Sequence, residues 1–270
     1  MEPFARLESV GLIMGPDGRK MSKRFGNVIN PDDVVKTYGA DTLRLYEMFM
    51  GPFDQAIAWS EEAIIGPRRF LERVWKVASQ VEKNFAALPA SGLRHGLNFS
   101  PPASLTKLLH KTIKKVSEDI AEMKFNTAIS SMMIFVNEVE KSNSISRGDF
   151  KQFLKILAPF APHMTEELWQ QFGGKRSDLK GAQGLTLKSQ DSIHLSSWPE
   201  YDKEKIKEEK VKIVIQINGK VRGEIIIEVD EKEEEIKQKA LESESVLRHT
   251  VGKSVKKVIY IKNRLINIVV

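Results

Sequence analysis

The 270-residue sequence contains no cysteine, which excludes disulfide bonds and cysteine–zinc clusters within the chain. It also has no run of the roughly 18–20 apolar residues that a membrane-spanning helix requires. The first 15 residues carry acidic side chains and lack the apolar stretch of a signal peptide. We therefore expect a cytoplasmic protein without a membrane anchor, and no metal ligands in this chain.

The composition is that of a folded protein, with 41% hydrophobic and 29% charged residues. Lysine and arginine outnumber the acidic residues, 42 to 36, which gives a net charge of +6. An excess of this size suits a polyanionic partner such as a nucleic acid, although many basic proteins are merely soluble. The charge alone therefore leaves the partner open.

Hydrophobic periodicity predicts a helical bundle over residues 60–172. Ahead of it, Asn30 and Pro31 mark the start of a short helix that ends near Gly39, and a second helix follows over about 41–50. In the bundle we expect helices over about 60–86, 104–123, 126–141 and 150–172, the last broken near Pro159 and Pro162. The candidate buried residues of the first bundle helix are Ile64, Phe70, Leu71, Val74, Trp75, Ala78 and Val81.

The last 60 residues change to a β-rich pattern. Residues 211–217 and 221–229 read as strands around Asn218-Gly219, which is the strongest short hairpin signal. An acidic helix to about residue 242 and a second hairpin over 256–270 complete a ββαββ unit. The mixed-charge stretch before it, residues 201–210, is predicted to be a linker.

The sharpest chemical signal is a basic loop near the start of the chain, in which Lys20, Met21, Ser22 and Lys23 are followed by Arg24. Lysines can follow a phosphate as charge develops on it, and a hydroxyl with backbone N–H groups adds donors. From these five residues alone, an exposed basic loop without a ligand is an equally good interpretation.

The wider sequence resembles the class I aminoacyl-tRNA synthetases. The loop is similar to their KMSKS signature, and GNVINPDD (residues 26–33) and YGADTLR (38–44) follow in the order of the enzymes for branched aliphatic amino acids. Four stretches resemble the leucyl enzymes of bacteria in particular: NPDD (30–33), LYEMFMGP (45–52), INGKVRG (217–223) and the ending KVIYI to INIVV (257–270). Segments 125–128 and 157–163 resemble the bundle of the same family.

The resemblance implies a role for each residue of the loop. Lys20 and Lys23 would be catalytic, and Lys20, Met21, Ser22 and Lys23 would bind ATP, which enters with Mg²⁺ as a substrate. The residue matching Lys23 stabilises the departing pyrophosphate in the family. Arg24 departs from the usual serine, which puts the mobility of the loop and the contacts of Arg24 in question.

The resemblance also implies that tRNA(Leu) is the partner. The bundle would lie along the tRNA and the C-terminal unit would contact its outer corner, with little reading of bases. Cations on that unit can neutralise phosphates, and an ordinary charged surface is the competing interpretation for each. The candidate tRNA-binding residues are Lys220, Arg222, Lys256, Lys257 and Arg264.

The first ATP signature, the nucleotide-binding core, the leucine pocket and the proofreading domain of the family have no counterpart in this sequence. We therefore expect the C-terminal portion or small subunit of a leucine–tRNA ligase, inactive without an N-terminal catalytic and editing portion. A tRNA-binding module or fragment without catalytic role is the alternative. The expected fold is mostly α: a KMSKS-type loop region (1–58), a helical anticodon-binding-type bundle (59–200), the linker (201–210) and a small α+β domain (211–270).

Overall fold

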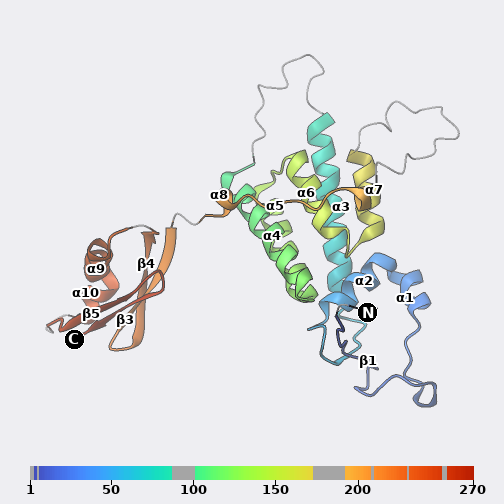
Figure 1. Ribbon diagram of the computed structural model, residues 1–270, viewed down its shortest axis with the longest axis horizontal. Helices are drawn as coiled ribbons and strands as arrows, with labels where there is room; N and C mark the ends of the chain where they lie inside the picture. The colour runs from blue at the N-terminus through green and yellow to red at the C-terminus, as the bar shows by residue number, and fades with distance from the viewer. Residues whose placement is uncertain are drawn as a thin grey trace. The chain divides into compact units, whose positions relative to one another are not determined.

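The computed structural model describes residues 3–4, 6–86, 101–172, 192–207, 210–229, 231–250 and 254–270. It divides into two compact units, Met1–Ile206 and Lys207–Val270 (Figure 1). Each unit has a hydrophobic core of its own. The first unit is largely helical and the second is a small α+β unit, which confirms the predicted fold class. Residues 87–103 and 173–200 read as loops in the sequence, and of these 87–100 and 173–191 lie outside the described residues.

The chain begins with a small region that carries the basic loop. Strand β1 (Ile13–Met14) pairs in parallel with β2 (Ile57–Ala58), and helices α1 (Pro31–Tyr38) and α2 (Ala40–Phe49) lie between them in sequence. Helix α1 begins as predicted, because the side-chain oxygen of Asn30 accepts the N–H of Asp32 at 3.2 Å. It ends at Gly39, whose φ of 91° explains the glycine.

Five helices form the bundle, as the periodicity predicts (Figure 1). They are α3 (Ile65–Ala86), α4 (Ala103–Ala121), α5 (Phe125–Ser142), α6 (Arg147–Leu157) and α7 (Pro162–Phe172). The break near Pro159 and Pro162 is confirmed, since α6 and α7 are separate helices there. No helix in the described ranges is both long enough and apolar enough to cross a membrane.

The first bundle helix differs from the prediction in two ways. It begins at Ile65 rather than near residue 60, because the Tyr46 hydroxyl bonds both the N–H and the carbonyl of Ser60 at 2.9 Å and holds it outside the helix. The expected buried stripe is present except at Trp75, which is 41% exposed. Trp75 directly follows Val74, so it lies at the edge of the stripe rather than on it.

Helix α2 connects the loop region to the bundle by contributing to two cores. Leu45 is fully buried in the bundle core, whereas Leu43 and Tyr46 pack in a smaller cluster with Trp59. At the other end, α8 (Lys203–Ile206) follows Asp202, whose N–H donates to His110 Nδ1 of α4 at 3.1 Å. Residues 201–206 of the predicted linker therefore lie with the bundle, and the division between the units falls after Ile206.

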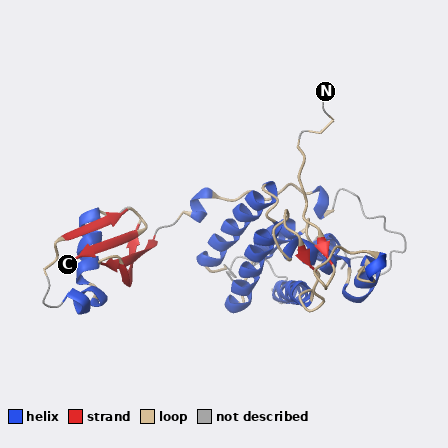
Figure 2. Cartoon of the chain, turned by 90° about the horizontal axis from the view of Figure 1, so that it is seen from below, coloured by secondary structure: helices blue, strands red, loops and turns tan. Residues whose placement is uncertain are grey.

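The second unit is a four-stranded sheet with two helices on one face (Figure 2). The predicted hairpins are present as β3 (Lys210–Ile217) with β4 (Lys220–Glu228), and β5 (Lys257–Ile261) with β6 (Leu265–Val269). The strand order is β4-β3-β6-β5, because β3 and β6 pair in parallel between the hairpins. Beside the predicted helix α9 (Glu233–Glu242), a second helix α10 (Glu244–Thr250) is present.

Helix α10 approaches β4 at Gly223. A Cβ atom at this glycine would lie 2.2 Å from the Oγ and 2.9 Å from the Cβ of Ser245. We expect Gly223→Ala to lower the free energy of unfolding of the second unit by about 1–2 kcal/mol, because α10 must shift away from the sheet. Chemical denaturation followed by circular dichroism measures this loss.

The matched control is Gly148→Ala in α6, where a Cβ atom would meet nothing closer than Ser146 Oγ at 3.8 Å. Because alanine favours a helix over glycine, we expect this change to raise stability slightly, by up to about 1 kcal/mol. A loss of the same size in both variants would show that the contact with Ser245 is not the cause.

Candidate functional site

The basic loop is built on a tight hairpin. Gly15 donates its N–H to the carbonyl of Arg19 at 2.8 Å, and Gly18 donates to the carbonyl of Gly15 at 2.9 Å. Gly18 has a φ of 72°, a conformation that glycine adopts without strain. Met14 of β1 bridges to Lys20, so the hairpin grows directly out of the small sheet.

After the hairpin, the signature residues form a short 3₁₀ turn over Lys23–Phe25. Ser22 caps the turn, since its Oγ accepts the N–H of Arg24 at 3.2 Å. Gly26 ends it in the left-handed conformation, with a φ of 64°. The Ser22 hydroxyl therefore fixes the start of the turn that carries Lys23.

Three cations of the loop are exposed and form no ion pair with any described residue. These are Lys20, Lys23 and Arg24. Arg19 differs, because it contacts Asp17 at 2.7 Å and lies over the Phe25 ring at 4.7 Å. A set of unpaired cations on a loop of fixed shape attracts a polyphosphate.

Met21 is turned toward the protein rather than toward solvent. It is half-buried and packs on the small cluster that includes Val34, Tyr46 and Trp59. Met21 therefore attaches the loop to the protein interior, while Lys20 and Lys23 on either side of it extend into solvent.

Asn27 and Asp17 also belong to the site, and the sequence analysis did not single them out. The Asn27 side chain accepts the N–H of Ser22 at 2.9 Å and donates to Asp17 at 3.0 Å. These bonds and those from Arg19 lower the pKa of Asp17 to about 2. Asn27 lies in the stretch GNVINPDD (26–33), but an acid and an amide on either side of the signature predict no contact by themselves.

The loop region is fastened to the bundle by two side chains of α2. Asp41 is 9% exposed, and its carboxylate accepts the N–H groups of His163 at 3.3 Å and Met164 at 2.6 Å, at the start of α7. The same carboxylate lies 2.7 Å from His163 Nδ1. One turn along, Arg44 donates to the carbonyl of Pro159 at 2.9 Å. The two residues bind the corner between α6 and α7 at two points.

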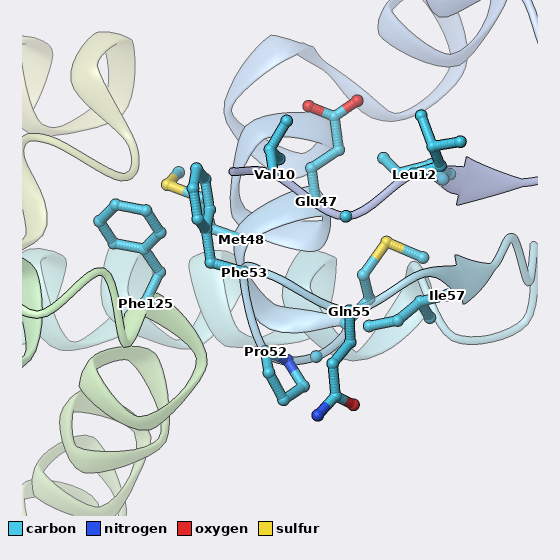
Figure 3. A pocket seen from close by; sticks show the side chains of 13 residues that line it. Val10, Leu12, Glu47, Met48, Pro52, Phe53, Gln55, Ile57 and Phe125 are labelled. Atoms are coloured by element: carbon cyan, nitrogen blue, oxygen red, sulfur yellow. The ribbon is translucent and has the colours of Figure 1, made fainter. Parts of the chain in front are cut away.

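A pocket of about 250 Å³ opens where the chain enters β1 (Figure 3). It is enclosed by residues 10–13 and 47–57, with Phe125 of α5 at one side. Its thirteen described lining residues include no lysine or arginine, so it offers no cationic side chain to a phosphate. Its carboxyl group belongs to Glu47, whose pKa is raised by burial and lowered in part by Arg44.

In the second unit, the five predicted cations are exposed and none forms an ion pair with a described residue. Lys220, Arg222, Lys256 and Lys257 lie at the end of the sheet that holds the 218–219 turn, but on opposite edge strands. Arg264 lies in the turn between β5 and β6, at the other end of those strands. The topology therefore brings four of the five to one end and separates Arg264 from them.

Three acidic residues of this unit lie together at the start of helix α9. Helix α9 begins with Glu233, Glu234 and Glu235, on the layer that covers one face of the sheet. Arg222 occupies a bulge in β4, where the register with β3 shifts next to Ile215. A polyanion would be repelled at the start of this helix.

Two family models match stretches of the chain. Residues 103–238 match the model of the anticodon-binding domain of tRNA ligases, and residues 1–60 match that of class I tRNA synthetases for I, L, M and V. Among solved structures, the chain is similar to a LeuRS of Agrobacterium radiobacter K84, agnB2, in a ternary complex with tRNA and LeuAMS. The identity is 28% with a TM-score of 0.77, over 99% of this chain and 34% of that chain. The chain thus spans about a third of the length of the protein it matches.

Proposed function

The chain belongs to the tRNA ligases that carry an anticodon-binding domain, with a first segment of the class I synthetase type, and from this premise we propose that it is the C-terminal portion or small subunit of a leucine–tRNA ligase. The complete enzyme would activate leucine with ATP in the cytoplasm and transfer it to tRNA(Leu). Leucine is favoured by the similarity to a LeuRS and by the leucyl-type stretches of the sequence.

The observation that carries the proposal is the set of unpaired cations on the ordered loop. Lys20, Lys23 and Arg24 would contact the triphosphate of ATP, and Lys23 would stabilise the departing pyrophosphate. Mg²⁺ would arrive with the nucleotide, since it binds mainly to substrate phosphates in sites of this kind. The described residues contain no group of three or more acidic or histidine side chains that could hold a metal.

The experiment is leucine-dependent ATP–pyrophosphate exchange, on this chain alone and after mixing with a purified N-terminal leucyl-synthetase portion. We expect no exchange with the chain alone and exchange activity after mixing. Exchange by the chain alone would contradict its incompleteness. No exchange in either sample, with tRNA binding intact, would favour a tRNA-binding module without a catalytic role.

The four cations at the turn end of the C-terminal sheet are the proposed contact with tRNA phosphates. Removing two of them with Lys220→Ala and Lys257→Ala should weaken tRNA binding uniformly across sequences, because phosphate contacts read no bases. The slope of log affinity against log salt should fall by about one to two in magnitude, as counterion release is lost. Filter binding over a range of salt concentrations measures both effects.

The matched control is Lys237→Ala on α9, since Lys237 is already paired with Glu233 at 2.5 Å. We expect this variant to keep the slope of the unaltered chain. Arg264→Ala tests the other end of the sheet separately. An equal effect per charge removed in all three variants would mean that the charge of the unit, and not the turn end, carries the binding.

A further inference from the structure

One side chain connects the two halves of the basic loop. The amide oxygen of Asn27 accepts the N–H of Ser22 at 2.9 Å, and its amide nitrogen donates to the carbonyl of Lys20 at 3.3 Å. These two backbone groups flank Met21. An amide that offers one acceptor and one donor to neighbouring peptide groups acts as a neighbouring strand would.

Asp17 holds the same amide from the other side. Its two carboxylate oxygens lie 3.0 and 3.3 Å from Asn27 Nδ2. Its carboxylate also accepts the backbone N–H of Arg19 at 3.1 Å and Arg19 Nε at 2.9 Å. Since Asn27 donates to both Asp17 and Lys20, an isosteric aspartate at position 27 would keep the bond to Ser22 and lose the other two.

Gly15 provides the space for these contacts. It is buried, and a Cβ atom there would lie 2.7 Å from Asn27 Nδ2 and 2.9 Å from Asp17 Oδ1. Any side chain at position 15 would therefore push the amide and the carboxylate apart. Gly15 and Asp17 on one side of the loop and Asn27 on the other thus meet at one contact.

We propose that Asp17 and Asn27 form a clasp that positions Lys20 and Lys23 for the nucleotide, with Asn27 as its central positioning residue. The proposal rests on the proposed ATP-binding role of the loop. The clasp fixes the peptide groups on both sides of Met21, so the backbones of the two lysines are set before the nucleotide arrives. Groups fixed in advance stabilise developing charge without a cost of reorganisation at the moment of reaction.

The test compares Asn27→Asp, Asp17→Asn and the double exchange D17N/N27D. In the single variant N27D two carboxylates face each other, whereas the double exchange restores an amide opposite a carboxylate. We expect N27D to lower kcat of ATP–pyrophosphate exchange in the reconstituted enzyme about tenfold or more. The KM for leucine and tRNA binding should stay unchanged. The double exchange should recover part of kcat, because it restores the contact between positions 17 and 27 but not the bond to the Lys20 carbonyl.

A second readout needs no activity. The loop contains four trypsin sites, at Arg19, Lys20, Lys23 and Arg24, and cleavage there in the chain alone can be followed by mass spectrometry. We expect N27D to speed this cleavage about tenfold and D17N/N27D to reverse the effect in part, since the bond to the Lys20 carbonyl stays lost. Gly15→Ala, which displaces the clasp without changing charge, should act like N27D.

The matched control is Asn137→Asp on α5, which adds the same charge where Arg73 already donates to the side-chain oxygen. If N27D and G15A behave like N137D in both readouts, the clasp is wrong. Lys23→Ala in the same assay separates this failure from that of the proposed function. A low exchange rate in Lys23→Ala together with a normal rate in N27D would contradict only the clasp. A normal rate in Lys23→Ala would contradict the ATP-binding role of the loop. Trypsin cleavage would then still show whether the clasp holds the loop.

Discussion

Replacing Lys23 with alanine should lower the rate of leucine activation in the reconstituted enzyme by about 10²–10³-fold. Lys23 is exposed at the start of the 3₁₀ turn capped by Ser22, and no described residue neutralises it. Loss of one preorganised group that meets developing charge has this effect in enzymes generally. Because the charge on pyrophosphate develops in the transition state, kcat should fall more than the affinity for ATP.

The measurement is ATP–pyrophosphate exchange with leucine and ATP varied separately. Lys36→Ala is the matched control, since Lys36 is an exposed lysine of the same unit in the last turn of α1. We expect it to leave the rate unchanged, and Lys23→Arg to recover part of the loss, since it keeps the charge but not the compact ammonium group. A normal rate in Lys23→Ala would mean that the loop takes no part in the chemistry.

The parts of the fold that the sequence predicts are those governed by local chemistry. Asn30 caps α1, Asn218-Gly219 turns between β3 and β4 with φ values of 48° and 78°, and the prolines separate α6 from α7. Each of these features depends on residues a few positions apart. Helix α10 was not predicted, because its seven residues are too few to establish a hydrophobic period.

The parts that the sequence does not predict depend on contacts between distant residues. The parallel pairing of β3 with β6 joins segments about fifty residues apart, and no local pattern specifies it. In the site, the cations of the loop were predicted from their type and spacing. Asn27 was not, because an asparagine has no special role until the fold brings a donor and an acceptor to it.

Among the contacts between distant residues that the sequence does not predict, we expect those of Asp41 to matter most for stability. Helix α7 begins at Pro162, and Ala161 before it has no side-chain acceptor to cap the helix. The carboxylate of Asp41 does so from α2, 122 residues away, at the N–H groups of His163 and Met164. A negative charge at a helix N-terminus is also favoured by the helix dipole.

We expect Asp41→Ala to lower the free energy of unfolding of the first unit by about 2–3 kcal/mol. It removes a buried charged acceptor and leaves two N–H groups without a partner. For a unit of this size the melting temperature should fall by about 5–10 °C, measured by thermal unfolding with circular dichroism. Asp41→Asn keeps one acceptor and should lose about half as much.

The matched control is Asp33→Ala, since Asp33 is an exposed aspartate in the first turn of α1 that accepts from Asn30. Its loss should cost no more than about 1 kcal/mol. Arg44→Ala should lose less than Asp41→Ala, and the double variant should lose less than the sum, because both side chains hold the same corner between α6 and α7. Full additivity would mean that they act independently, and an Asp41→Ala variant as stable as the unaltered chain would show that α7 needs no cap from α2. Because α2 also packs on the cluster that anchors Met21, a loosened corner should slow the exchange reaction as well, through the placement of the loop.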